Sequence, residues 1–186
     1  MGAGSSNPEE IRTPKELSSL SPQEHNTYNR LAVRMEQFHE HFRHTWTMLY
    51  DAAITKRRPS NFTQEELIDA GIRFVDNLEG HHRVEETYIF PVLAKRMPEF
   101  RHNGRNQKAA ELILQHEEIH RGMTAMREYL IACKDGIADF QFSILQQKMD
   151  SWGKTLWIHL EQEVKVLGVE SMRQYWTMDE MTAFPF

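Results

Sequence analysis

Two segments of the chain, 78 residues apart, share one spacing of apolar residues and one interruption of that spacing. Apolar or small residues recur every three or four positions, which is the period of an amphipathic helix and not of a strand. Towards its end, each stripe contains a histidine followed four residues later by a glutamate. The two stripes are Leu67, Gly71, Phe74, Leu78, His81, Glu85 and Ile89, and Leu145, Met149, Trp152, Leu156, His159, Glu163 and Leu167.

Helical patterns separated by short loops cover most of the remaining sequence. Sustained period-2 alternation, the pattern of a half-buried strand, does not occur. Pro91 lies inside the second helical pattern and should kink or shorten it. We therefore predict an all-α fold, an antiparallel up-down four-helix bundle with a short C-terminal helix. The predicted helices span 22–53, 63–97, 106–133, 139–167 and 169–176.

The length of 186 residues fits one domain with tails at both ends. Residues 1–24 are rich in Ser, Pro and Gly and are predicted to be a flexible tail. The bundle is predicted to span 25–176, and 177–186 to form a C-terminal tail. The sequence around Gly2 also fits the loose pattern for N-myristoylation, although a plain Gly/Ser tail is the simpler interpretation.

Composition excludes several classes of protein. The net charge is −5 and no long Lys/Arg run stands out, so an electrostatic nucleic-acid footprint is not expected. The apolar stretch at 89–94 is far too short to span a membrane. Cys133 is the only cysteine and no secretory signal is present, which favours a reducing, cytoplasmic location.

Ionisable side chains occupy helix positions that should face the core. With 3.6 residues per turn, the histidines and glutamates of the two stripes lie within about 55° of the stripe centres. Buried carboxylates and imidazoles are costly without partners. Two such residues four positions apart on a helix can reach one ion, and imidazole and carboxylate both bind divalent metals. On the third predicted helix, His116 and His120 share a face with Ile113 and Met123. The predicted ligands from the three helices are His81, Glu85, His116, His120, His159 and Glu163.

The first helix should supply one further ligand. His39 lies roughly 55° from the centre of its apolar stripe, His41 about 105° away and His44 nearly opposite. We therefore predict His39 as the ligand and keep His41 as the alternative. His25, His44 and His102 are expected to be solvated.

An alternative also exists on the second helix. His82 and Glu86 have the same spacing as His81 and Glu85 and could replace them. Glu86 falls about 85° from the stripe centre, so it is expected at the edge of the inward face.

These motifs resemble the hemerythrin-like, or HHE, family over residues 28–167, and most closely its single-domain fungal members. The resemblance implies a four-helix bundle that holds two non-haem iron ions joined by an oxo or hydroxo group. The residues that carry it are His39 with Phe42, Arg43 and Trp46, the run from His81 to Glu86 before Phe90 and Pro91, the run from His116 to His120, and the run from His159 to Glu163.

The resemblance also implies an assignment of ligands. One iron would take three histidines, the other two, and two glutamates would bridge them, leaving an open position for dioxygen on the second iron. Oxygen carriers of the family have a bridging aspartate five residues after the last histidine, whereas this chain has a glutamate after four. The implied sets are His116, His120 and His159; His39 and His81; and the bridging Glu85 and Glu163.

Two classes of function follow from such a centre. The first is a binding protein for dioxygen, another diatomic or peroxide, acting as an oxygen, redox or iron sensor or as a carrier. The alternative is a di-iron oxidase, oxygenase or peroxidase that acts on a small organic molecule, and iron storage is a third hypothesis. An enzyme needs an organic-sized cavity beside the metals, for which the candidate lining residues are Tyr50, Tyr88, Tyr129 and Arg127.

Overall fold

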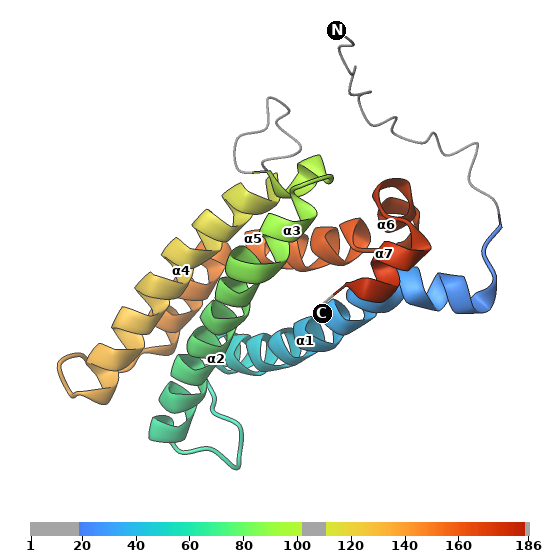
Figure 1. Cartoon of the computed structure of the whole chain (residues 1–186). Helices are drawn as coiled ribbons and strands as arrows, with labels where there is room; N and C mark the ends of the chain where they lie inside the picture. Colours follow the sequence, from blue (N-terminus) through green and yellow to red (C-terminus); the bar gives the residue numbers. More distant parts are fainter. Residues whose placement is uncertain (1–18, 102–110, 185–186) are drawn as a thin grey trace, which may run out of the picture.

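The computed structural model describes residues 19–101 and 111–184, and within these ranges the chain forms helices and no strand. The all-α prediction is confirmed. The four longest helices pack as neighbours, α1 with α5 and α2, and α4 with α5 and α2 (Figure 1). The predicted tail at 1–18 and the predicted helix start at 106–110 lie outside the described residues. The four long helices are α1 (Pro22–Thr55), α2 (Gln64–Val84), α4 (Glu111–Lys134) and α5 (Phe142–Val166).

Capping boxes begin the first two helices. Ser21 Oγ accepts from the Glu24 backbone N–H, and the Glu24 carboxylate accepts from the Ser21 N–H. Thr63 and Glu66 make the same reciprocal pair before α2. These caps satisfy backbone donors that have no partner within the helix. They therefore set where α1 and α2 begin.

The second predicted helix changes its hydrogen bonding before Pro91. After α2 the chain forms a π-helix, η2 (Glu85–Ile89), and then α3 (Phe90–Leu93). Pro91 has no backbone N–H, and its ring clashes with an ordinary helical partner four residues earlier. The π-turn absorbs this conflict, and the helical segment ends at Leu93 instead of Met97. A short 3-10 turn, η3 (Pro98–Phe100), follows.

The C-terminal boundary differs from the prediction. The expected short helix is present as α6 (Val169–Tyr175), but a further helix, α7 (Met178–Ala183), follows where a tail was predicted. The Arg96 guanidinium binds both carboxylate oxygens of Glu180 at 2.8 and 2.6 Å. Met181 and Phe184 are buried against α1 and α6. This apolar contact draws the segment onto the bundle.

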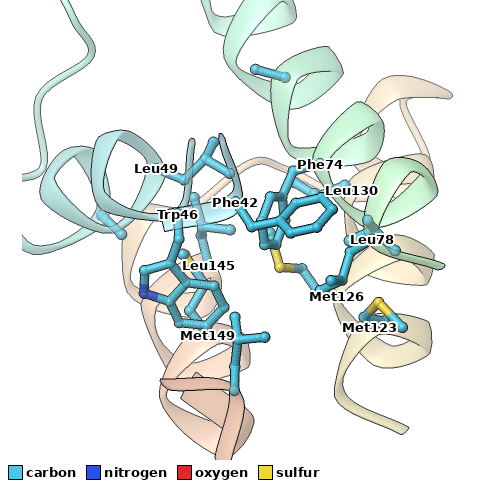
Figure 2. Packing of buried hydrophobic residues seen from close by; sticks show 14 of the residues in the cluster. Phe42, Trp46, Leu49, Phe74, Leu78, Met123, Met126, Leu130, Leu145 and Met149 are labelled. Carbon is cyan, nitrogen blue, oxygen red and sulfur yellow. The ribbon is translucent and has the colours of Figure 1, made fainter. Parts of the chain in front are cut away.

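The apolar core consists of two clusters separated along the bundle. The first is built around Phe42, Trp46, Phe74 and Trp152, and Figure 2 shows the side chains of several of its members pointing toward one another. The second lies at the end covered by α6 and α7, and includes Met35, Phe90, Leu112 and Leu167. Five of the predicted ligands fall, along the chain, between residues of the first cluster and residues of the second: His39, His81, Glu85, His116 and Glu163. No described helix combines the length and apolar character needed to cross a membrane.

Candidate metal centre

Seven ionisable side chains from all four long helices meet between the two apolar clusters. Six are fully or almost fully buried, and the side chain of His81 is 10% exposed. The α2 register brings two adjacent histidines inward, and Glu85 follows as the first residue of the π-turn. The seven are His39 from α1, His81, His82 and Glu85 from the α2–η2 segment, His116 from α4, and His159 and Glu163 from α5.

The seven residues form two groups that share Glu85. Within each group, one donor atom from every residue lies within 4.8 Å of the others. Ligands at about 2.0–2.2 Å from one ion lie at most about 4.4 Å apart, so each group is close to the size of a metal site. The first group contains His39, His81, Glu85 and Glu163, and the second contains His82, Glu85, His116 and His159.

The two carboxylates lie between the imidazoles. Glu85 places Oε1 2.8 Å from His81 Nε2 and Oε2 3.7 Å from His116 Nε2. Glu163 places Oε2 3.3 Å from His39 Nε2 and 3.7 Å from His159 Nε2. Each carboxylate therefore faces histidines of both groups, as a bridging ligand does.

The donor atoms that face this centre lack hydrogen bonds. Buried polar atoms are nearly always satisfied, so a concentration of unsatisfied ones in one place calls for a missing partner. Carboxylate oxygens and unprotonated imidazole nitrogens all carry lone pairs, and divalent cations would satisfy them together. The residues therefore fit a metal centre. The unsatisfied atoms are Nε2 of His39, His81, His116 and His159, both ring nitrogens of His82, and both carboxylate oxygens of Glu85 and Glu163.

Three of the imidazoles are oriented through their other nitrogen. His39 Nδ1 lies 3.1 Å from the Leu160 carbonyl oxygen. His159 Nδ1 lies 3.3 Å from Gln115 Oε1, and His116 Nδ1 lies 2.8 Å from Glu86 Oε1. An acceptor at Nδ1 holds the proton there and leaves the Nε2 lone pair free, which is the usual support of a metal-binding histidine.

Burial sets the protonation of the site. It lowers the pKa of His81 to about 4 and of His159 to about 3, and it takes the pKa of His82 well below its ordinary value. These imidazoles are neutral at pH 7, as metal ligands must be. Burial raises the pKa of Glu85 well above its ordinary value, with a further rise from the charge of Glu163. A cation beside Glu85 would oppose this rise and favour the ionised carboxylate.

Not every predicted ligand joins the two groups. His120 is 35% exposed and lies 3.1 Å from Glu86 Oε1, in an outer cluster with His116 and Glu86. The alternative residue His82 is fully buried instead, with its ring centroid 4.0 Å from that of His116. His41 is exposed, as are the expected solvated residues His25 and His44, whereas His102 lies outside the described residues.

The position of α2 explains why both adjacent histidines point inward. Because α2 contacts α1 on one side and α4 on the other, its buried face is wider than a single stripe. His81 lies toward His39 of α1, with ring centroids 5.6 Å apart, and His82 lies toward His116 of α4. In the sequence, the adjacent pair of histidines at 81 and 82 was the one feature that indicated a second inward-facing histidine on α2.

A pocket opens beside each group. One, of about 600 Å³, lies between α1 and the α2–η2 segment and reaches His81 and Glu85. The other, of about 640 Å³, lies between η2–α3 and α4 and reaches His116, His120 and Glu86. The candidate lining residues named from the sequence line neither pocket. Three make other contacts, Tyr50 with Asp150, Arg127 with Asp76 and Tyr129 with Gln141, and Tyr88 is 62% exposed.

Comparison with known families gives one match, the hemerythrin HHE cation binding domain, over residues 30–168. The matched segment covers well over half of the chain and contains all seven residues of the centre. Searches among curated proteins and among solved structures gave no match.

Proposed function

Because the chain belongs to the hemerythrin HHE cation-binding family, we propose that it is a non-haem di-iron protein that binds dioxygen or a related diatomic, as a sensor or carrier. The observation that carries the proposal is the shared carboxylate of Glu85. Two buried groups of four donors that have one residue in common suit two adjacent ions better than one.

The proposed ligands follow these groups. One ion is held by His39, His81, Glu85 and Glu163, and the other by His82, His116 and His159 with Glu85 as the bridge. His120, which the family resemblance also implied, lies in the outer cluster with Glu86 and is proposed to support His116. Two reduced iron ions, when bound, supply two electrons to a small ligand.

The surrounding residues favour the binding of a small ligand over reactions that need highly oxidised iron. Five imidazoles and two carboxylates leave two divalent ions with a net positive charge, which disfavours highly oxidised iron. Phe42 contacts the His81 ring at 5.1 Å and Phe90 contacts the His116 ring at 5.0 Å between centroids. These apolar rings cover part of the centre and reduce the access of water to the two imidazoles.

A second candidate function is supported by the pocket that reaches His81. Its volume of about 600 Å³ far exceeds that of a diatomic and suits a small organic molecule. A di-iron oxidase, oxygenase or peroxidase acting on such a molecule is therefore the alternative.

Metal analysis and stopped-flow absorption test the proposal. Protein produced with iron should hold about two iron atoms per chain, and Glu85→Gln should hold markedly fewer because it removes the shared ligand. Anaerobically reduced protein mixed with oxygenated buffer should give one long-lived change in visible absorbance. A single tightly bound zinc would refute the di-iron proposal, and rapid turnover of an added organic substrate would favour the enzyme.

A further inference from the structure

We propose that the pocket between α1 and α2, here called the α1–α2 pocket, binds an organic anion with an apolar body, such as a medium-chain or aromatic carboxylate. Arg34 pairs with the charged group, and the apolar body lies against the His81 face of the metal centre. The inference rests on the proposed function only in taking that face as part of a metal site.

The walls of the α1–α2 pocket are apolar. Ligand pockets of roughly 300–1,000 Å³ with mainly hydrophobic lining and a few polar groups are typical of small-molecule sites. At about 600 Å³ this pocket lies within that range. Its apolar wall is formed by Leu31, Met35, Phe38, Phe42, Ile89 and Leu167.

The floor of the pocket belongs to the metal centre. His81 and Glu85 line it, and the His81 ring centroid lies 5.4 Å from that of Phe38. The His81 side chain is 10% exposed, whereas those of His39 and His159 are fully buried. An occupant of the pocket would therefore touch His81 and the shared Glu85, and none of the histidines of the second group.

Gly80 keeps the pocket open. A Cβ atom added at Gly80 would meet nothing within 4 Å, so packing does not require a glycine there. At Gly122 and Gly153, by contrast, an added Cβ would lie 2.2 Å from Trp152 and 2.6 Å from Trp46. A glycine inside a helix lowers stability. Gly80 lines the pocket, and an empty space at this position is what a ligand would use.

Arg34 supplies an unused cation at the pocket. Of three arginines on α1, Arg30 donates to the Phe184 carbonyl oxygen and Arg43 binds Glu36 and Glu40. Within the described residues, the exposed side chain of Arg34 has neither an ion pair nor a hydrogen bond. The one carboxylate in the lining, that of Glu85, lies on the floor.

The positions of these groups define the shape of the ligand. Arg34 precedes Phe38 by one turn, about 6 Å along the helix axis. A cation at one end and an apolar wall leading to His81 suit a molecule whose charge lies at one end. Guanidinium groups pair with carboxylates through two parallel hydrogen bonds, so a carboxylate is the favoured anion.

Isothermal titration calorimetry tests the proposal. The full chain, in iron-loaded and in metal-free form, is titrated with decanoate and with decan-1-ol. Decanoate should bind, and Arg34→Ala should weaken it about tenfold while leaving decan-1-ol unchanged. Arg73→Ala is the matched control, since Arg73 is an exposed helical arginine that lines no described pocket, and it should change neither. Gly80→Leu should weaken both ligands at least tenfold without altering iron content.

The outcomes separate this inference from the proposed function. Two bound irons with no decanoate binding would overturn the inference alone. Decanoate binding that needs iron but not Arg34 would also overturn it, because the carboxylate would then bind the metal. Arg34-dependent binding to a chain that holds no iron would support the pocket and refute the di-iron proposal.

Discussion

The imidazole of His116 connects two carboxylates of different character. Its Nδ1 lies 2.8 Å from Oε1 of the half-exposed Glu86 in η2, and its Nε2 lies 3.7 Å from the buried Glu85 Oε2. The pKa of Glu86 is lowered chiefly by the hydrogen bond with His116, so Glu86 is ionised and accepts the Nδ1 proton. Glu86 is therefore placed to orient His116 and to raise the basicity of its Nε2.

The first prediction concerns this support. Glu86→Ala should weaken iron binding about 10- to 100-fold, which is the usual effect of losing such a partner. Competition with a coloured chelator would measure the change. Glu79→Ala, which removes an exposed carboxylate on the preceding α2, is the control. Equal effects of the two substitutions would show that general charge, and not the contact with His116, is responsible.

The second prediction separates His82 from His120. His82 is fully buried in the second group, whereas His120 is 35% exposed and bonds Glu86. His82→Ala should reduce the iron content toward one per chain, and His120→Ala should retain close to two. If His120→Ala is the variant that loses iron, the assignment implied by the family resemblance holds and the one drawn from burial is wrong.

The third prediction concerns α1. His39 is fully buried with Nε2 3.3 Å from Glu163, while His41 is exposed in the lining of the α1–α2 pocket. His39→Ala should lose iron and the absorbance change with dioxygen. His41→Ala should retain both, and circular dichroism would establish that the two variants are equally helical. Loss of iron in His41→Ala but not in His39→Ala would identify His41 as the ligand from α1.

The fourth prediction concerns pH in the metal-free protein. Burial lowers the pKa of His159 to about 3 and of His81 to about 4. As the pH falls, the unfolded chain therefore takes up protons at these two histidines before the folded chain does. Stability should therefore fall as the pH decreases from about 6.5 toward those values. Glu85 acts in the opposite sense, because its raised pKa favours proton uptake by the folded state.

Urea unfolding across this pH range isolates the contribution of one histidine. His159→Gln removes one titrating group, so the slope of unfolding free energy against pH should decrease by up to about 1.4 kcal/mol per unit. Identical slopes in the variant and the parent would mean that His159 is not held neutral.

The fifth prediction compares two helical glycines. Gly122→Ala should destabilise the protein by about 1–3 kcal/mol, because the new Cβ would meet the Trp152 side chain. Gly80→Ala should stabilise it by roughly 0.5–1 kcal/mol, since the added Cβ meets nothing and alanine favours the helix. The melting temperatures of the two variants would test this. A change of the same sign in both would contradict the inference that only Gly122 is required by close packing.

Much of the helical framework could be predicted because it depends on local patterns. Capping boxes at Ser21 and Thr63 act within one turn, and an apolar stripe must face a core wherever the core lies. The position of Pro91 indicated a disturbed helix, but not that a π-turn would absorb it. The helix α7 was missed because its stability comes from burying Met181 and Phe184 against distant residues.

The sequence alone determined that histidines and glutamates would interrupt apolar helix faces, since period and residue type are properties of each helix by itself. Only the tertiary structure decided which atoms meet. The wide inward face of α2 between α1 and α4 placed both His81 and His82 at the centre, and packing of α4 brought His116 within 2.8 Å of Glu86. The α1–α2 pocket likewise exists only between helices. Distances between elements depend on the packing of the whole core, which no single helix contains.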